Sequence, residues 1–512
     1  MIRIGVDVGG TNTDAVVLNG PEVIGGAKRP TTADVHSGVR AAIAAALEAA
    51  AMAPASVDAV MVGTTHFVNA LVERKRLAPT GLIRLCLPSG SSLKPFADWP
   101  TDLMQSMGLG FRLVDGGYEM DGRELAPLNP GQILTAVREL RAEGCTELAI
   151  SAVFATIRGD SEREAAALIA AEFPDMAITL SQDIGRIGLL ERENAATINA
   201  ALRPLAESVV AAFGSIREAM GLKCPLFFTA NDGTLIDSAE VARLPVLTFA
   251  CGPTNSMRGA AYLSGVKNAL VVDIGGTTTD VGEVRDGFPR LAGTSVEVVD
   301  VRTNFSMPDV ISVGLGGGSL IKPGGRVGPD SVGRELITRA MVFGGDTLTA
   351  SDIVVAAGRA TMGTHPAPKV ENIEAYLAAI EQIVADAVAR SRTSAEVMPV
   401  LAVGGGSVLM GDEVDGLKVI RPPHFDLANA VGAAIAQISG ESSKIIPVTA
   451  GLTREEAIES VAAEARAMAI ARGAAPDSII VLSKSDVPLS YLPGNNLSIS
   501  VTVVGDLKLE AR

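Results

Sequence analysis

The sequence has few of the residues that mark several classes of protein. Its 512 residues include 4 cysteines, 4 histidines and one tryptophan, and aromatic residues make up 4% of the chain. The cysteines lie far apart, which excludes a disulfide framework and the paired spacing of a zinc or iron–sulfur site. Together with the scarcity of histidine, this leaves no expected zinc site built by the protein alone. The cysteine usage predicts a reducing, cytoplasmic location.

Long apolar runs and basic runs are also missing. The Ala-rich stretch at residues 39–53 is interrupted by Arg40 and Glu48, and the first residues show no secretory signal pattern. We therefore expect neither a membrane span nor a secreted precursor. The net charge is −15, and lysine and arginine form no long run. A nucleic-acid or anionic-membrane surface is not expected.

Length and glycine are what the sequence has in abundance. A chain of this length is expected to form two or three domains. Its 54 glycines and few aromatic residues favour α/β layers packed by small aliphatic side chains and joined by tight turns. The positions of the glycines are therefore informative.

One glycine motif occurs twice. Residues 7–14 read Asp-Val-Gly-Gly-Thr-Asn-Thr-Asp and residues 273–280 read Asp-Ile-Gly-Gly-Thr-Thr-Thr-Asp, so six of eight positions are identical. Each copy follows an apolar run and precedes a shorter one, which predicts a strand–turn–strand hairpin. The repeat predicts two related α/β domains that face each other.

Apolar patterns around the two copies predict further elements. After the first copy come a strand near 23–27, a helix from about residue 34, a strand at 57–62, a helix at 67–75 and a strand at 82–87. The second half resumes with a strand at 399–403, a helix after Gly406, a strand at 417–420 and a helix at 427–438. We expect a first lobe at 1–90, an inserted or bridging α/β region at 91–265, a second lobe at 266–440 and a small α+β cap at 441–512.

The duplicated turns are suited to binding phosphate groups. A turn without Cβ atoms lets backbone N–H groups converge on an anion, and threonine hydroxyls add donors. Asp7 and Asp273 precede the turns, and a carboxylate beside phosphate is best explained as a ligand of hydrated Mg²⁺. The expected phosphate-binding residues are Gly9, Gly10, Thr11, Asn12, Thr13, Gly275, Gly276, Thr277, Thr278 and Thr279.

Two further glycine runs are candidates for the same ligand. Gly404, Gly405 and Gly406 lie between a predicted strand and helix, where a nucleoside could lie flat against the backbone. Gly316, Gly317 and Gly318 are followed by Lys322 and Arg326, as in a loop that closes over phosphates or an anionic substrate. A packing device at the start of a helix is the alternative for the first run, and a plain surface loop is the alternative for the second.

Several side chains complete the candidate site. Asp14 and Asp280 end the two repeats, and His66 follows Gly63-Thr64-Thr65 at a strand-to-helix junction, where it could face the cleft or cap the helix. We include these three among the catalytic candidates with Asp7 and Asp273. Cys251 has no recognisable base, so a small buried residue at a turn is favoured over a nucleophile. Asn231-Asp232-Gly233 is a weaker substrate-side candidate.

These motifs together resemble the actin-like ATPase superfamily, and more narrowly the hydantoinase A/oxoprolinase family. The motifs that carry the narrower resemblance are Gly63-Thr64-Thr65, residues 69–75, residues 192–200, Cys251-Gly252-Pro253, residues 314–319, residues 327–333, residues 347–352 and residues 429–434. They run in order from residue 3 to about 440. The family often has a His directly before Gly-Thr-Thr, whereas this chain has Val62 there and His66 after the motif.

The resemblance implies a fold and a chemistry. The fold would be two ribonuclease-H-like domains around a nucleotide cleft. The activity would be ATP- and Mg²⁺-dependent opening of a cyclic amide such as a hydantoin, 5-oxoproline or a related lactam or imide. Longer family members continue beyond the length of this chain and work with, or are fused to, a hydantoinase B-type polypeptide. A homo-oligomer or a hetero-oligomer with such a subunit is expected.

Other functions fit the same motifs. A kinase that phosphorylates a hydroxyl or carboxylate would leave a stable phosphorylated product. A nucleotide switch that gates a partner is a second alternative, although neither an iron–sulfur cysteine pair nor a peptide-binding β-domain is visible in the sequence. An ATP-dependent carboxylase subunit is a variant of the first activity, because it also activates an oxygen atom with ATP.

Overall fold

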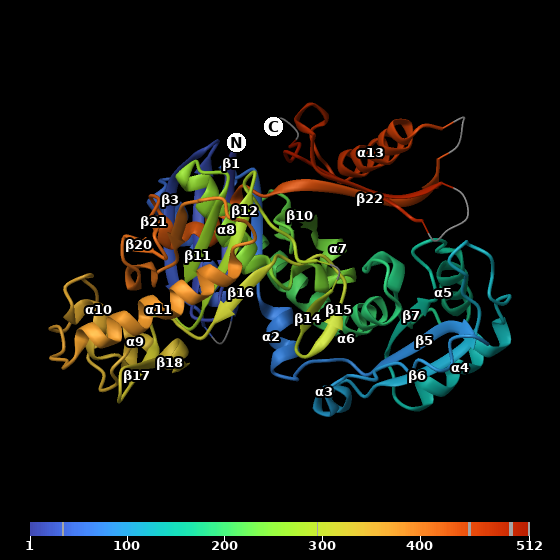
Figure 1. The fold of residues 1–512 in the computed structure, drawn as a ribbon, viewed down its shortest axis with the longest axis horizontal. Helices are drawn as coiled ribbons and strands as arrows, with labels where there is room; N and C mark the ends of the chain where they lie inside the picture. The colour runs from blue at the N-terminus through green and yellow to red at the C-terminus, as the bar shows by residue number, and fades with distance from the viewer. Residues whose placement is uncertain (33–34, 294, 449–451, 491–494, 510–512) are drawn as a thin grey trace.

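The computed structural model describes residues 1–32, 35–293, 295–448, 452–490 and 495–509. It is a mixed α/β structure in which two lobes, each built on one copy of the repeated hairpin, lie against each other (Figure 1). A separate four-stranded sheet lies at the lower right of Figure 1, and the C-terminal segment lies above it. This arrangement confirms the expected fold class of two related α/β domains.

The first lobe is built from the first hairpin and the strands beside it. Its strands are β1 (Ile2–Val8), β2 (Asn12–Asn19), β3 (Glu22–Pro30), β4 (Ala59–Thr64) and β9 (Leu226–Thr229). They lie in the order β3-β2-β1-β4-β9, with β2 antiparallel to β1 and β3, and β4 and β9 parallel to β1. Helices α1 (Val35–Ala49) and α2 (His66–Val72) flank β4 along the chain. Asp34, where the sequence places the start of the first helix, lies outside the described residues.

The second lobe repeats this arrangement. Its strands are β11 (Ala269–Ile274), β12 (Thr279–Arg285), β13 (Phe288–Pro289), β16 (Val310–Val313), β19 (Val400–Val403), β20 (Glu413–Val414) and β21 (Leu417–Ile420). The order β13-β12-β11-β19-β21 matches the order in the first lobe, and β19 and β21 are again parallel to β11. Asp7 pairs with Asp14 in one hairpin as Asp273 pairs with Asp280 in the other. The duplication in sequence is therefore a duplication of structure.

The C-terminal segment extends the sheet of the first lobe. The added elements are β10 (Thr234–Asp237), β22 (Gln437–Pro447), β23 (Ile480–Pro488), β24 (Asn496–Gly505) and α13 (Arg454–Ala471). The nine strands follow the order β23-β24-β22-β10-β9-β4-β1-β2-β3. Alternate buried residues of β24 pack against α13. The four-part division of the chain stays a prediction, but the sheets do not follow it, because this sheet takes strands from three of the four parts.

The inserted region contains a parallel sheet of its own. Its elements are β5 (Thr80–Leu87), β6 (Gly110–Asp115), β7 (Glu147–Ala152), β8 (Ala177–Leu180), α3 (Thr101–Ser106), α4 (Pro130–Ala142), α5 (Asp160–Glu172) and α6 (Leu189–Ala219). The strands lie in the order β6-β5-β7-β8. The sequence pattern assigns β5 to the first lobe, and this assignment is wrong. Arg84 of β5 is fully buried and bonds to Glu193 of α6, with Nε 2.7 Å from Oε2, which anchors β5 to the insertion.

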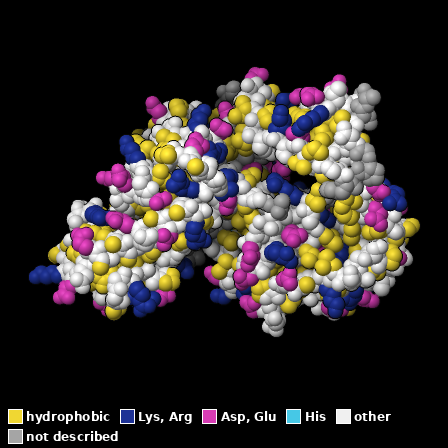
Figure 2. All heavy atoms as spheres, viewed as in Figure 1, with side chains coloured by type: hydrophobic (Ala, Val, Ile, Leu, Met, Phe, Trp, Pro, Cys, Tyr) yellow, Lys and Arg dark blue, Asp and Glu magenta, His cyan; other side chains and the backbone are white. Residues whose placement is uncertain are grey.

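The remaining elements are short or lie in the insertion of the second lobe. They are α7 (Ser238–Arg243), β14 (Val296–Val298), β15 (Val301–Thr303), β17 (Ser319–Lys322), β18 (Arg326–Ser331), α9 (Leu336–Arg339), α10 (Ala350–Ala356) and α11 (Ile373–Ser391). The part from β17 to α11 extends to the left in Figure 1. On the face shown in Figure 2, acidic and basic side chains are intermixed over the surface. Within the described ranges, no helix has the length and apolar character needed to cross a bilayer.

The helix expected after Gly406 is replaced by a single 3-10 turn, η6 (Ser407–Leu409). Arg421 provides the reason, because its guanidinium donates hydrogen bonds to the carbonyl oxygens of Met410 and Gly411 at 2.6 and 3.0 Å. These carbonyls are satisfied without the next turn of a helix. The following helix is also shorter than expected: α12 (Ala428–Ala434) ends before β22 begins.

Two helices cross where the lobes meet. Helix α8 (Cys251–Ser264) and α12 contact each other through backbone atoms, since a Cβ atom on Gly259 would overlap the carbonyl of Ala428. A Cβ atom on Gly432 would likewise overlap the carbonyl of Asn255, and one on Gly5 of β1 would overlap that of Ala430. The glycines therefore allow α12 to lie directly on both α8 and β1. A second link is the β14–β15 hairpin, because Val301 is buried in the core cluster of the first lobe.

Candidate nucleotide and metal site

The two repeated motifs lie together at the junction of the lobes. Asp7 is next to the carboxyl end of β1, beside Gly63 of β4, and Asp273 has the same place in β11. A Cβ atom on Gly276 would lie 3.3 Å from Thr11 Oγ1, so the two turns are neighbours in space. The Asn429 Nδ2 atom of α12 donates a hydrogen bond of 3.4 Å to Asp7. This amide therefore links α12 to the first motif.

The two turns have matching internal hydrogen bonds. Gly9 N donates to Asn12 O at 3.0 Å, and Gly275 N donates to Thr278 O at 2.9 Å. The tips of the turns are more exposed to solvent than the positions that flank them: Gly10, Thr277 and Thr278 are exposed. These exposed tips are the parts of the motifs that a ligand can contact, whether by backbone N–H groups or by hydroxyls.

Not every expected phosphate residue faces outward. Thr13 and Thr279 are buried, and Thr279 Oγ1 donates to the carbonyl of Leu315 at 2.7 Å. Thr13 Oγ1 lies 3.2 Å from the hydroxyl of Thr31. The structure therefore places these two threonines under the turns, where they hold the hairpins, while Thr11, Asn12, Thr277 and Thr278 remain accessible.

Four carboxylates crowd this junction. Burial and the charge of Asp14 raise the pKa of Asp7 to about 7, and burial raises the pKa of Asp280 to about 6. Burial also raises the pKa values of Asp14 and Asp273. The nearby cation is Lys28 of β3, whose Nζ lies 2.6 Å from Asp14 Oδ2. Because one lysine faces four aspartates, the site has an uncompensated negative charge that favours a cation.

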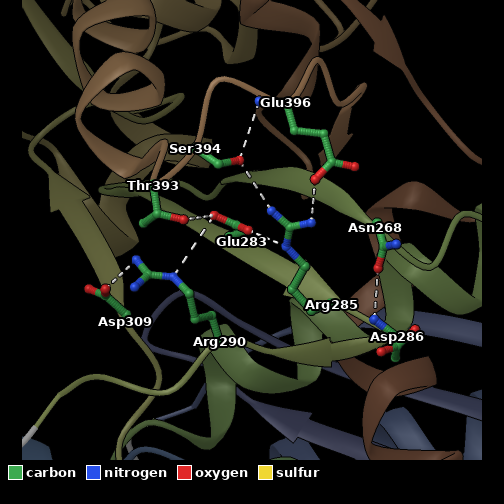
Figure 3. A network of polar contacts seen from close by, with 9 residues as sticks. All are labelled: Asn268, Glu283, Arg285, Asp286, Arg290, Asp309, Thr393, Ser394 and Glu396. Carbon is green, nitrogen blue, oxygen red and sulfur yellow. Dashed lines mark hydrogen bonds and ion pairs between the residues drawn. The ribbon is translucent and has the colours of Figure 1, made fainter.

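Another cluster of acidic residues, in the second lobe, differs in that each acid has an arginine partner. Around β12, Glu283, Asp309 and Glu396 are paired with Arg285 and Arg290 (Figure 3). Arg285 Nη1 lies 2.6 Å from Glu396, and Arg290 Nε lies 3.9 Å from the buried Glu283. This pairing is typical of a structural ion-pair network. At the lobe junction, by contrast, four aspartates share the neighbouring Lys28.

The residues at the junction fit Mg²⁺ better than a metal held by protein ligands alone. Within the part of the chain that is described, no group of three or more His, Cys, Asp or Glu side chains is arranged to hold a metal ion. Mg²⁺ commonly keeps several water molecules and takes one or two carboxylates together with substrate phosphates. Asp7 and Asp273 could supply those carboxylates. Asp14 is held by Lys28, and Asp280 contacts the hydroxyl of Ser312.

The Gly316–Gly318 run packs beneath the second phosphate-type turn and does not face a ligand. All three residues are buried, and their N–H groups are paired within the protein. Gly317 N donates to Gly275 O at 3.0 Å and Gly318 N donates to Gly276 O at 2.7 Å, while Gly316 N donates to the Ser319 hydroxyl. The run therefore lies directly against the second phosphate turn and fixes it. Its amides have no free N–H group to offer a phosphate oxygen.

The Gly404–Gly406 run lies on the other side of the same turn. Gly406 N donates to Ile274 O at 2.8 Å, and Gly404, with a positive φ of 81°, lies close to Asp273 Oδ1. Gly405 is exposed and has nothing within 4 Å of its Cβ position. The run is thus anchored at both ends and open in the middle. This geometry suits a flat ligand lying against Gly405, as the sequence predicts for a nucleoside.

His66 and Cys251 occupy the first-lobe side of the site. His66 is the first residue of α2, and its Nδ1 contacts the hydroxyl of Thr64 rather than capping a backbone N–H group. Burial, aided by the charge of Arg76, lowers the pKa of His66 to about 4, so the imidazole is neutral near pH 7. Cys251 Sγ accepts from Thr64 N at 3.2 Å and donates to Thr64 O at 3.3 Å. Burial raises the pKa of Cys251 to about 12, which favours the structural interpretation of this thiol.

His66 should make the protein acid-sensitive. The folded state keeps His66 neutral down to about pH 4, whereas the unfolded chain takes up the proton near pH 6.5. Stability therefore falls as the pH drops through this window, because the unfolded state binds more protons. Relative to His66→Gln, the wild type is expected to lose on the order of 2 kcal/mol more of its unfolding free energy between pH 7 and 4.5. Urea unfolding of both proteins at several pH values measures this, and parallel pH curves would contradict it.

Two site residues are missed by the sequence analysis. Lys28 lies opposite Asp14 in β3, and Asn429 lies at the start of α12. The position of Lys28 could have been predicted by pairing the third strand with the second, because in a three-stranded meander Lys28 then lies opposite Asp14. Asn429 begins one of the family-like motifs, but its contact with Asp7 joins residues 422 positions apart. Nothing local in the sequence indicates that contact.

Asn231 has a structural position. Its side chain donates to Val246 O at 2.9 Å and accepts from Ala250 N at 2.8 Å, so it fixes the chain that enters α8. Asp232 accepts hydrogen bonds from Thr234 within the same turn. Lys322, expected near an anionic ligand, pairs instead with Asp330 at 2.5 Å. The contacts of these residues are therefore within the protein itself.

Two lobes with duplicated phosphate-type hairpins and the same strand order define an actin-like α/β fold. Residues 3–173 match the hydantoinase/oxoprolinase N-terminal region and residues 192–398 match the hydantoinase/oxoprolinase domain. The chain therefore belongs to the hydantoinase/oxoprolinase family.

Relatives and solved structures agree with this assignment. The chain is 25% identical over 484 residues to the caprolactamase subunit alpha of Pseudomonas jessenii, covering 88% of this chain and 69% of that protein. It is 27% identical over 398 residues to the acetophenone carboxylase gamma subunit of Aromatoleum aromaticum (strain DSM 19018 / LMG 30748 / EbN1), covering 69% of this chain and 53% of that protein. The chain thus spans about half the length of the second relative.

Two solved structures share the fold over nearly the whole chain. The ATP-dependent caprolactamase from Pseudomonas jessenii has a TM-score of 0.73 at 18% identity, and the nucleotide-free acetone carboxylase has 0.71 at 17%. Each comparison covers 99% of this chain and 88% of the other. At these identities the similarity establishes the fold.

Proposed function

We propose that this chain binds Mg²⁺-ATP where the two lobes meet and transfers the γ-phosphoryl group to the oxygen of a cyclic amide, which prepares the ring for opening. The observation that carries the proposal is the set of four aspartates from two duplicated hairpins, for which Lys28, paired with Asp14, is the neighbouring cation among the described residues. The relatives include an ATP-dependent caprolactamase, which supports a lactam-type substrate. A hydantoin, 5-oxoproline or an imide belongs to the same chemical class.

The chemistry addresses the low reactivity of an amide. The amide oxygen attacks the γ-phosphorus, the bond to ADP breaks, and the nitrogen loses its proton, which leaves a phosphorylated imidate. Water then adds to the carbon, and the ring C–N bond breaks to give an amine and an acyl phosphate. A second water attacks the same carbon, so that inorganic phosphate leaves with the former amide oxygen and a carboxylate remains. The protein contributes mainly position and charge stabilisation.

Each part of the site has a role in this proposal. Asp7 and Asp273 would hold Mg²⁺, which neutralises charge on the phosphates when it is bound. The exposed turn tips would contact the phosphates, and Gly405 would contact the nucleoside. His66, neutral and two residues after the end of β4, is the candidate acceptor for the amide proton.

A carboxylase subunit is the second candidate. The observation that favours it is the similarity to an acetophenone carboxylase subunit and to a structure of acetone carboxylase. In both chemistries ATP activates an oxygen atom of the substrate. Both relatives are named as subunits, which supports a second polypeptide as partner for this chain, either for hydrolysis or for carboxylation. The cytoplasm remains the proposed location.

Release of ADP by the purified chain tests the proposal. The panel contains caprolactam, 5-oxoproline, hydantoin, succinimide, acetophenone with bicarbonate, and a simple sugar. For the amide that stimulates ADP release, substrate labelled with ¹⁸O at the carbonyl should transfer the label to inorganic phosphate. Label that stays in the carboxylate excludes phosphorylation of the amide oxygen. A stable phosphorylated product from the sugar would support a kinase, and stimulation only by acetophenone with bicarbonate would support a carboxylase.

A further inference from the structure

The side chain of Asn429 contacts one of the two aspartates proposed to bind Mg²⁺. It lies in the first turn of α12, and its Nδ2 donates to Asp7 Oδ2 at 3.4 Å. The amide N–H group can only donate to a carboxylate oxygen, so this contact orients the side chain of Asp7.

The backbone around Asn429 is fixed by close contacts. Gly432 lies against the carbonyl of Asn255 in α8, and Gly5 of β1 lies against the carbonyl of Ala430. These contacts join backbone to backbone, so they leave little freedom for α12 to move by side-chain rearrangement. Asn429 is thus held at a set distance from β1, which carries Asp7, and from α8.

Helix α8 contributes polar side chains near the same aspartate. Asn255 donates to Thr229 Oγ1 at 2.9 Å and lies close to Gly63, beside Asp7. The hydroxyl of Ser256, the next residue, is buried and has no hydrogen-bond partner among the described residues. The two crossing helices therefore both bring polar side chains toward Asp7.

The chemical type of residue 429 matters as much as its position. A lysine there would neutralise the carboxylates and compete with a metal ion, as Lys28 does for Asp14. An asparagine orients the carboxylate of Asp7 and leaves its negative charge in place. We propose that Asn429 is a positioning residue that holds the Asp7 carboxylate in the orientation needed to bind hydrated Mg²⁺. This inference rests on the proposed function and concerns the metal-dependent part of nucleotide binding.

Calorimetric titration with ADP, at several Mg²⁺ concentrations and in EDTA, tests this role without turnover. For Asn429→Ala, the Mg²⁺ concentration that gives half of the gain in ADP affinity should rise about tenfold or more, as for other residues that orient metal ligands. The ADP affinity in EDTA should stay within about twofold of the wild type, because the nucleotide itself is not contacted. Asn429→Ser, which keeps a short donor, should fall between the two proteins and serves if the alanine variant folds poorly.

Gln382→Ala is the matched control. Gln382 Nε2 donates to Asp386 Oδ1 at 2.7 Å, so this variant also removes an amide–carboxylate bond, but within the exposed face of α11. It should titrate like the wild type. An unchanged Mg²⁺ requirement in Asn429→Ala overturns the positioning role, and so does an equal loss of affinity in EDTA. A wild type that binds no ADP at any Mg²⁺ concentration would instead overturn the proposed nucleotide site.

Discussion

Replacing Asp7 by asparagine is expected to reduce Mg²⁺-ATP turnover by at least about 1,000-fold. The change keeps the size of the side chain but removes a charged oxygen from the place where two lobes bring their carboxylates together. Asp273→Asn should have a comparable effect, because Asp273 has the same position in the second hairpin. The assay is ADP release with the amide that stimulates the wild-type protein, measured at saturating Mg²⁺-ATP.

The same substitution should leave the fold intact and make it slightly more stable. Burial and Asp14 raise the folded-state pKa of Asp7 to about 7, above the value of an exposed aspartate. The folded protein therefore loses stability as the pH rises from about 4 to 7, since the carboxylate must ionise in an unfavourable site. Asparagine has no such loss. At pH 8 the melting temperature of Asp7→Asn should equal or exceed that of the wild type.

Asp309→Asn is a suitable control for the activity measurement. Asp309 lies in the balanced network of the second lobe, where it pairs with Arg290 (Figure 3). Its replacement should leave turnover near the wild-type rate. Wild-type turnover in both Asp7→Asn and Asp273→Asn would remove the basis for the metal assignment. A collapse of the melting temperature in these variants would instead show that the aspartates have a structural role.

The sequence was informative where the determinants are local. The repeated octapeptide contains the turn glycines, the threonines under the turn and the aspartates at both ends, so a single alignment of the chain with itself predicts both hairpins. The structure confirms the hairpins and gives them the same register. The contact between Thr11 and Gly276 adds that the two turns are neighbours. The duplication alone does not predict that the two turns are neighbours. It does so only together with the expectation that the two lobes face each other.

Strand neighbours could not be obtained in this way. The apolar runs of β5 and β9 are both compatible with a place beside β4, and the structure places β9 there. Strand β5 lies instead between β6 and β7, where the buried pair of Arg84 and Glu193 joins residues 109 positions apart. The C-terminal strands similarly join the first lobe through β10 and β22, far from it in sequence. Such long-range pairing leaves no periodic signal in either strand.

The candidate site shows the same limit for individual side chains. Glycine runs indicate close approach of the backbone, but not whether the neighbour is a ligand or another part of the protein. Gly405 is open, whereas Gly317 is covered by the second turn. Lys28 and Asn429 were missed because their roles depend on contacts across a sheet and between lobes. The charge imbalance at the junction becomes visible only when these contacts are known.

Gly432→Ala should be among the most destabilising single-methyl changes in the protein. The new Cβ atom would overlap the carbonyl of Asn255, so α12 and α8 would have to separate. Backbone displacement in a close-packed contact is expected to cost about 3 kcal/mol. Because Asn429 is in the same short helix, the displacement should also weaken Mg²⁺-dependent ADP binding. Urea unfolding and the ADP titration measure the two effects.

Gly214→Ala shows why the contact, and not the helix, is responsible. Gly214 lies inside α6, and nothing lies within 4 Å of its Cβ position. A methyl group there removes the flexibility of glycine from a helix without a clash, so it should stabilise the protein by about 0.5 kcal/mol. The two changes are chemically identical, and both are made inside helices. If the two variants shift the urea midpoint in opposite directions, the close crossing of α8 and α12 holds the lobes together. A shift in the same direction would contradict this role of the crossing.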